Sequence, residues 1–272
     1  MKTSFTAFWR RNLAFFRLAV ITNLEYRVNF LTDVVLQPVC TALIELTLWI
    51  AIFASSTSTS IGGFTREYYL AYVLWVAFIG RISSSWMYEF RMIEEVESGS
   101  INGLLVRPMS FFEYYLSQLM GYKFVTSIFS LMIPLAVIYW MDLPTDFSKV
   151  PIALALVVYY LIMVHCLSFI VSTFAFSLTR VHSFTVAKNL ALWLLSGELI
   201  PLDLIPEPFK SVLLKLPFCN AVYMPVAYMT GRIPRDVFMQ GFLSTTLGIL
   251  FFGAIGWWLW RRGLTKYVGT GA

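Results

Sequence analysis

The chain has 272 residues, of which 58% are hydrophobic and only 13% are charged, and its mean hydropathy is +0.73. Soluble domains carry about 25% charged and about 45 to 50% apolar residues, so this composition excludes a protein whose main solvent is water. We attribute the net charge of +5 to Lys and Arg held on the cytoplasmic side of a membrane, near anionic lipid, and expect no nucleic-acid partner.

The amino-terminal segment, residues 1–27, predicts a cytoplasmic helix lying in the membrane interface. The apolar residues that share one helical face are Phe5, Trp9, Leu13, Phe16 and Val20. Arg10 and Arg17 fall on the opposite face, as in an amphipathic helix. The alternative is an ordinary basic flank of the first span, and both interpretations place this end in the cytoplasm.

Six apolar stretches approach the length of about 20 residues that a helix needs to cross a bilayer core of about 30 Å. They run over residues 30–53, 68–87, 124–141, 152–176, 186–200 and 241–260. The fifth is short and ends at Pro201. We therefore predict an all-α integral membrane protein with six transmembrane helices in a single domain, residues 1–272.

The distribution of Lys and Arg predicts the orientation. With the amino end inside, thirteen of these residues fall in cytoplasmic segments, six fall outside, and Arg81 lies within a span. Cytoplasmic segments of membrane proteins carry the excess of basic residues. Both termini are therefore expected in the cytoplasm, in agreement with an even number of spans.

Residues 201–240 are too polar and too rich in proline for a simple span, yet residues 211–218 and 221–228 are apolar. This pattern indicates a helical hairpin that re-enters the outer leaflet, where protein or a cavity must cover any irregular backbone. An external loop with two surface helices is the alternative.

Charged residues inside spans are costly and indicate pairing or function. Arg81 lies thirteen residues after Tyr68, about 20 Å along a helix, and so in the inner part of the bilayer. Asp33, near the inner start of the first span, is a feasible partner. A structural ion pair or snorkelling is one interpretation, and contact with a transported substrate is the other.

Glu45 and Glu198 lie at similar depths in the first and fifth spans, so the two carboxylates can face one cavity. They could attract a cationic or amphipathic cargo, or bond to neighbouring helices in a neutral form. His165, in the middle of the fourth span, is interpreted as a hydrogen-bonded packing residue, with a proton carrier as the alternative. The three cysteines are far apart and predict neither a disulfide nor a metal site.

Two stretches of the sequence resemble the ABC type-2 permease family. The first combines an acidic helix, a Ser-Gly break, an apolar run and Arg107-Pro108, over residues 94–110. The second is similar to the end of that family's fifth span and the re-entrant hairpin beyond it, and its marker residues are Ser196, Gly197, Pro201, Pro206 and Pro217. The tail, residues 261–267, also fits.

The resemblance implies a six-span exporter subunit of the bacterial cytoplasmic (inner) membrane, working by alternating access on a lipid-like, drug-like or polymer cargo. It further implies a second permease subunit, identical or paralogous, and two ATPase subunits that bind ATP and Mg. The chain itself then needs no cofactor and is no catalyst. No G-x-x-x-x-G-K-[ST] phosphate loop occurs in the sequence.

The resemblance also implies that residues 88–111 couple the permease to the ATPase. The residues expected to do so are Glu94, Glu95, Val96, Glu97, Gly99, Ile101, Leu104, Leu105, Arg107 and Pro108. Together with Glu89, the acidic residues suit a basic groove on the partner, and Leu104 and Leu105 can fill a pocket there. A solvated loop with ordinary charges is the alternative.

Two other classes of protein remain as alternatives. An intramembrane lipid-modifying enzyme could use Glu45, Glu198 and His165, although these residues lack the spacing of a metal or nucleophile site. An ion-coupled secondary transporter would be expected to show more intramembrane charges and an internal repeat.

Overall fold

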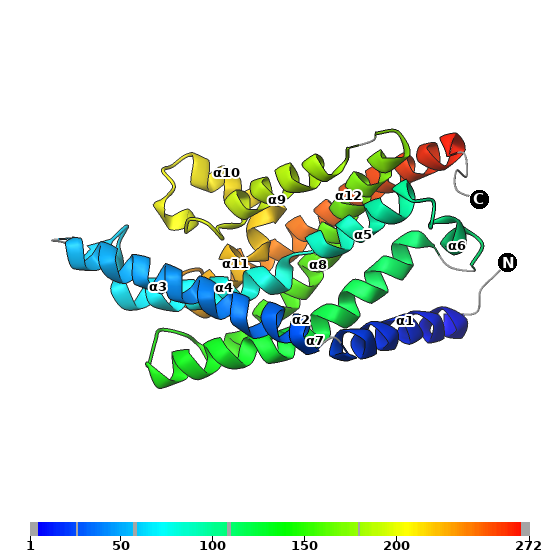
Figure 1. Ribbon diagram of the computed structural model, residues 1–272. Helices are drawn as coiled ribbons and strands as arrows, with labels where there is room; N and C mark the ends of the chain where they lie inside the picture. Colours follow the sequence, from blue (N-terminus) through cyan, green and yellow to red (C-terminus); the bar gives the residue numbers. More distant parts are fainter. Residues whose placement is uncertain (1–4, 26, 57–58, 108–109, 179, 268–272) are drawn as a thin grey trace.

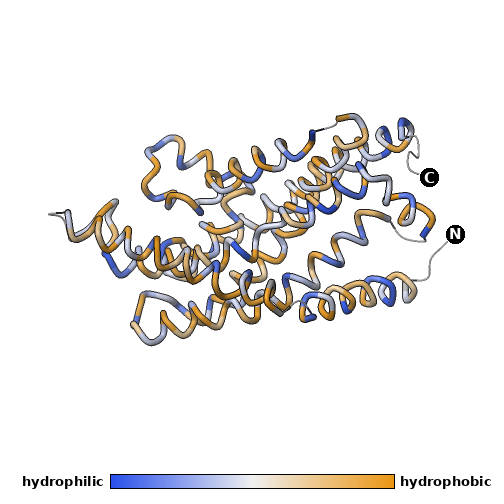
Figure 2. The backbone as a smooth tube through the Cα atoms, in the orientation of Figure 1, coloured by the Kyte–Doolittle hydropathy of each residue, from blue (hydrophilic) through white to orange (hydrophobic). Residues whose placement is uncertain are grey.

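The computed structural model describes residues 5–25, 27–56, 59–107, 110–178 and 180–267. The described part is almost wholly helical, and the longer helices run roughly along one axis of an elongated bundle (Figure 1). The predicted all-α membrane class is confirmed. In Figure 2 the tube is apolar along much of its length, and hydrophilic stretches occur at its ends and also midway along the bundle.

The amino-terminal part forms a helix beside the bundle and then the first span. Its elements are α1 (Phe5–Glu25), α2 (Arg27–Leu31), a π-helical turn (Thr32–Leu36) and α3 (Gln37–Ser55). Helix α1 packs closely on α7 at Gly121, which has no side chain. A β-carbon at this position of α7 would lie 2.6 Å from the carbonyl oxygen of Phe16. Trp9 and Leu13 point away from this contact and are 58% and 47% exposed.

A short antiparallel pair, β1 (Ser60–Ile61) and β2 (Phe64–Thr65), leads into the central helix of the bundle, α4 (Arg66–Ser83). Residues 68–80 of α4 are all buried, which fits a stretch that is hydrophobic around its whole circumference. The helix ends at Ser83, the backbone of Ser84 is extended, and α5 (Trp86–Glu97) continues after this break.

Helix α6 (Asn102–Leu105) lies at one end of the molecule and precedes α7 (Phe111–Trp140). Helix α7 begins with a reciprocal cap, in which the Ser110 hydroxyl accepts a hydrogen bond from the Glu113 amide and the Glu113 carboxylate accepts one from the Ser110 amide. This cap places the start of the helix thirteen residues before the predicted span at residue 124.

Helix α8 (Val150–Thr173) packs along α12 (Arg235–Lys266) through a row of glycines. Gly248, Gly256 and Gly263 of α12 are buried, and a β-carbon at each would meet a side chain of α8 or of the turn that follows it, Phe174–Phe176. Small residues let two helix backbones approach closely inside a membrane.

In the sequence, five elements separate α8 from α12. They are α9 (His182–Ser196), a 3₁₀ turn (Leu202–Leu204), α10 (Phe209–Lys215), a second 3₁₀ turn (Pro217–Ala221) and α11 (Tyr223–Met229). Every residue of α11 is buried, and α11 packs on α4, α8 and α12. It is therefore not a surface helix, whereas no residue of α10 is fully buried.

Five helical segments of the described part are long and apolar enough to cross a membrane: Thr32–Ser55, Arg66–Glu97, Phe111–Trp140, Phe147–Phe176 and Arg235–Lys266. They correspond to five of the six predicted spans. The remaining stretch, predicted at residues 186–200, corresponds to α9, which has 15 residues and ends at Gly197. At 1.5 Å per residue it extends about 22 Å, so α9 alone falls short of a bilayer core.

In Figure 1 the two ends of the chain lie at the same end of the bundle, together with α6 and the connection between α8 and α9. The loop between α3 and α4, the loop after α7 and the region around α10 lie toward the opposite end. This arrangement agrees with termini on one side of the membrane. We call the end of the bundle with α6 and the two termini the α6 end, and the opposite end the α10 end.

Candidate functional site

The segment between α5 and α7 forms a firm turn at the α6 end. Helix α5 stops because Gly99 takes a left-handed conformation, with φ of 77°, and its amide bonds to the carbonyl of Val96. Val96, Ile101 and Leu104 are buried beneath the turn, in a cluster that includes Phe111. The backbone after Gly99 therefore folds back onto the body of the protein.

One prediction about this turn needs correction. Leu104 was expected to fill a pocket in the partner beside Leu105, but it packs with Val96 and Ile101 against the body of the protein. Leu104 is only 8% exposed, whereas Leu105 is 42% and Val106 is 86% exposed. The apolar surface that the turn presents is therefore Leu105 and Val106, beside the exposed Arg107. Pro108 lies outside the described residues.

The acidic patch is smaller than the sequence suggested. Glu94 and Glu97 are exposed, and Glu95 is partly buried. Glu89 is fully buried and forms an ion pair with Lys188 of α9, so it belongs to the interior rather than to the patch. The ammonium group of Lys188 also donates to the Ser168 hydroxyl at 3.2 Å.

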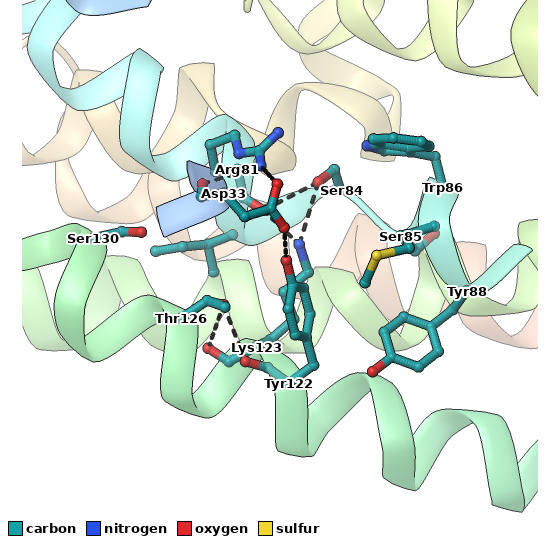
Figure 3. Close-up of a pocket in the computed structure, with 12 residues that line it drawn as sticks. Asp33, Arg81, Ser84, Ser85, Trp86, Tyr88, Tyr122, Lys123, Thr126 and Ser130 are labelled. Atoms are coloured by element: carbon teal, nitrogen blue, oxygen red, sulfur yellow. Dashed lines mark hydrogen bonds and ion pairs between the residues drawn. The ribbon is translucent and has the colours of Figure 1, made fainter. Parts of the chain in front are cut away.

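The break between α4 and α5 lies beside a cluster of charged residues (Figure 3). Arg81 and Asp33 form the ion pair that their positions in the sequence suggested. The Arg81 guanidinium also donates to the Asp33 carbonyl at 3.1 Å, and the Tyr122 hydroxyl donates to the Asp33 carboxylate. Asp33 thus joins α4 and α7 to the start of the first span.

Lys123 completes this cluster from α7. Its ammonium group donates to the carbonyl of Arg81 and, at 3.2 Å, to the hydroxyl of Ser84. The last carbonyls of a helix lack partners within the helix and carry partial negative charge, so a cation is stabilising there. A cavity of about 60 Å³ adjoins the cluster, bordered by Ser84, Tyr122 and Lys123.

Because Lys123 and Lys188 lie in the interior, they are not loop residues as the charge count assumed. The sequence pattern missed both because each lies close to the boundary of a predicted span. Removing them leaves eleven basic residues in the predicted cytoplasmic segments against six outside. The asymmetry that favours cytoplasmic termini is therefore retained.

Glu45 of α3 and Glu198, just after α9, line one cavity of about 250 Å³, as expected from their similar depths. Glu198 lies against the backbone of α4, since a β-carbon at Gly80 would be 2.6 Å from the Glu198 Oε1 atom. Among the described residues, neither carboxylate has a hydrogen-bond donor or an ion-pair partner in the structure.

His165 is buried in α8, where its Nε2 atom lies 3.1 Å from the carbonyl oxygen of Phe112. Its ring also packs on the Phe112 ring, with 4.6 Å between the centroids. These contacts agree with the interpretation of a hydrogen-bonded packing residue. His165 lines neither of the two cavities described above.

The predicted hairpin begins where α9 stops. Gly197 is left-handed, with φ of 81°, and its carbonyl accepts a hydrogen bond of 2.7 Å from the Tyr72 hydroxyl. The Ser196 hydroxyl accepts from the Glu198 amide at 3.2 Å. Pro201 and Pro217 precede or begin the two 3₁₀ turns, and the Pro206 carbonyl accepts from the Lys210 amide.

The structure adds a residue that no pattern in the sequence singled out. The side chain of Asp203 is fully buried, and its carboxylate accepts four hydrogen bonds, each from 2.9 to 3.1 Å long. The donors are Tyr68, Lys210, Tyr223 and Arg232. Burial alone would raise the pKa of Asp203, but these hydrogen bonds and the charges of Lys210 and Arg232 outweigh it and lower the pKa.

Asp203 ties the start of α4 to α10, α11 and the loop before α12, at the α10 end of the bundle. Arg232 is further fixed by the ring of Phe64, which lies 3.6 Å from its guanidinium carbon. Within the described residues, no group of three His, Cys, Asp or Glu side chains is arranged to hold a metal ion.

Five long apolar helices, with charged clusters beside a broken helix, are the arrangement of a multi-pass membrane protein. The family model of the ABC-2 family transporter proteins matches residues 39–271, nearly the whole chain. The chain belongs to this family, and is thus a multi-pass membrane subunit of an ABC transporter, a type that associates with ABC ATPases. Comparison with curated proteins gave no match.

Proposed function

We propose that this chain is the transmembrane subunit of an ATP-driven exporter in the bacterial cytoplasmic membrane. Separate ATPase subunits bind ATP and Mg and drive a lipid-like, drug-like or polymer cargo outward by alternating access. The observation that carries the proposal is the turn between α5 and α7, which presents acidic and apolar side chains at the same end of the bundle as the two termini.

The docking surface is made of Glu94, Glu97, Leu105, Val106 and Arg107. The carboxylates suit a basic groove on the ATPase, and the two apolar side chains suit a pocket beside it. The buried residues beneath the turn hold this surface in a fixed shape. A preorganised surface loses less conformational entropy on binding than a mobile loop would.

The turn is also connected to the interior in a way that supports transmission of force. Helix α5 is held to α9 by the Glu89–Lys188 ion pair and to α8 by a hydrogen bond of 2.8 Å between the hydroxyls of Ser85 and Ser168. At its other end α5 meets α4 at the break beside Ser84. A displacement of the turn would therefore reach both the break and the charged cluster around Arg81.

A second permease subunit, identical or paralogous, is part of the proposal. In α3 and α12, only 11% and 17% of the residues in the most apolar stretch are buried within this chain. Lipid covers such surfaces in part, and close helix packing between subunits can cover the rest. Two permease subunits would enclose the transport path between them and dock two ATPase subunits.

Co-purification with the ATPase tests the proposed docking surface. Changing Glu94 and Glu97 together to Lys should abolish or strongly weaken capture of the ATPase, because like charges facing a basic groove repel. Glu67, exposed at the opposite end of the bundle, provides the matched control Glu67→Lys, which should retain full capture. Equal capture by all three proteins would remove this turn from the interface.

A further inference from the structure

The cavity that contains Glu45 and Glu198 has the character of a ligand site. Three segments line it: α3, α4, and residues 198–204 after α9. Its volume of about 250 Å³ is close to the lower end of the range for small-molecule pockets. Apart from the two carboxylates, its lining is aliphatic or aromatic and includes Trp49 and Tyr72.

Among the described residues, those that line the cavity with the two carboxylates include no Lys or Arg. Arg81 and Lys123 are the basic residues within electrostatic range of Glu198, but Arg81 is paired with Asp33 and Lys123 is bonded to carbonyl and hydroxyl oxygens. Carboxylates in an apolar environment without a positive partner are costly. A cation bound between them would offset that cost.

The aromatic residues favour an organic cation over a metal ion. Trp49 stacks on Tyr69, with 4.1 Å between the ring centroids, so its orientation is fixed by packing. An ordered indole face can hold an alkylated ammonium group by cation–π attraction. The cavity offers carboxylate oxygens from only two side chains, whereas the hard metal ions require six or more oxygen ligands.

The cavity also borders the outer surface of the bundle. Leu48 of α3 lines it and is 56% exposed, and Ile44, one turn earlier on α3, is 70% exposed. An apolar body attached to the cation could therefore lie along α3, on the surface expected to face lipid. This arrangement suits a molecule that reaches the site from the bilayer.

We propose that this cavity binds an amphipathic organic cation, with its ammonium group between Glu45 and Glu198 and its apolar body along α3. The inference names a cargo class and so rests on the proposed function for its role in transport. Two kinds of molecule carry an alkylated or primary ammonium group on an apolar body. One is a free organic cation, and the other is an aminophospholipid, whose headgroup supplies the ammonium group.

Calorimetry on the permease alone tests this binding. The protein is placed in nanodiscs of a neutral galactolipid, which has no ammonium group, and titrated with dodecyltrimethylammonium, with empty nanodiscs subtracted. We expect saturable binding that Glu45→Gln and Glu198→Gln each weaken and that the double variant weakens at least about tenfold. Glu67→Gln, an exposed carboxylate outside the cavity, should bind as the unmodified protein does.

Dodecyl sulfate, which has the same chain and the opposite charge, should show no saturable binding. Phosphatidylethanolamine added to the nanodiscs separates the two sources of the ammonium group. If this lipid weakens dodecyltrimethylammonium binding, the site belongs to the lipid headgroup. If binding is unchanged, the site belongs to a free organic cation. A folded double variant that binds the cation unchanged would overturn the inference, as would equal binding of the sulfate. This binding assay contains no ATPase, so its result does not depend on the proposed function. In a separate assay with the ATPase and ATP, cation binding without transport would count against the proposed function and leave the binding site intact.

Discussion

Lys188 of α9 and Glu89 of α5 form an ion pair inside the bundle, although 99 positions separate them in the sequence. The Glu89 side chain is fully buried, and that of Lys188 is 12% exposed. The pair fixes α5, which carries the proposed docking turn, to α9, which precedes the segment predicted to form a hairpin.

Removing one partner of this pair should destabilise the protein more than removing both. Glu89→Gln leaves the Lys188 ammonium group buried and unpaired, which costs about 3 to 5 kcal/mol, and Lys188→Met leaves the carboxylate in the same state. The double variant lacks both charges and should recover much of that stability. Thermal unfolding in detergent measures all three, and additive losses in the double variant would argue against direct pairing.

Arg81→Ala should lower the yield of folded protein more than Arg81→Lys. Among the described residues, the alanine variant leaves the Asp33 carboxylate with the Tyr122 hydroxyl as its one donor, whereas a lysine can restore the charge. Fluorescence-detected size-exclusion chromatography of the two variants gives the comparison. Equal yields would argue against a stabilising ion pair between Arg81 and Asp33.

The glycine row on α12 predicts a difference between two neighbouring positions. Gly256→Val places a side chain against Phe169, where even a β-carbon would lie 3.1 Å from the ring. Gly253→Val changes the same residue type one turn earlier, where a β-carbon would have an ordinary contact of 3.8 Å. We expect a loss of about 1 to 3 kcal/mol at Gly256 and little at Gly253, measured as thermal stability. Similar losses at both positions would contradict the close approach of α8 and α12.

Asp203 predicts a loss of stability in acid. The folded state lowers the pKa of Asp203 below its unfolded value of about 3.9. The ionised carboxylate therefore stabilises the folded state fully above the unfolded pKa, and this stabilisation is lost as the pH falls through the folded pKa. The unfolding temperature between pH 6 and pH 3 should therefore fall more steeply in the unmodified protein than in Asp203→Asn. Asp236→Asn, an exposed carboxylate at the start of α12, is the control. Parallel curves for all three proteins would exclude this role.

The sequence predicted the features that hydropathy makes conspicuous. A charge within an apolar run stands out, so the Arg81–Asp33 pair and the shared depth of Glu45 and Glu198 could be recognised without coordinates. Gly99 could likewise be recognised as the end of α5, because glycine readily takes the left-handed conformation that stops a helix.

The features that the sequence could not predict depend on long-range contacts. Glu89, Lys123 and Lys188 lie near the ends of apolar runs, where hydropathy cannot distinguish a solvated side chain from a buried pair. Asp203 is surrounded by donors from positions 68 to 232, and this arrangement exists only after the helices have packed. Leu104 and Leu105 are identical in type, and only the fold shows that the first is buried and the second exposed.

Cross-linking from Val106 tests the central claim, that the ATPase docks on the turn between α5 and α7, most directly. Val106→Cys, in a protein whose exposed Cys40 is replaced by serine, is labelled with a maleimide–benzophenone reagent and irradiated in membranes that contain the ATPase, so that the benzophenone can insert into C–H bonds of any protein that contacts it. A cross-link to the ATPase is expected from this position, and none is expected from Lys215→Cys at the α10 end. Absence of a cross-link from position 106, or an equal yield from position 215, would contradict the account.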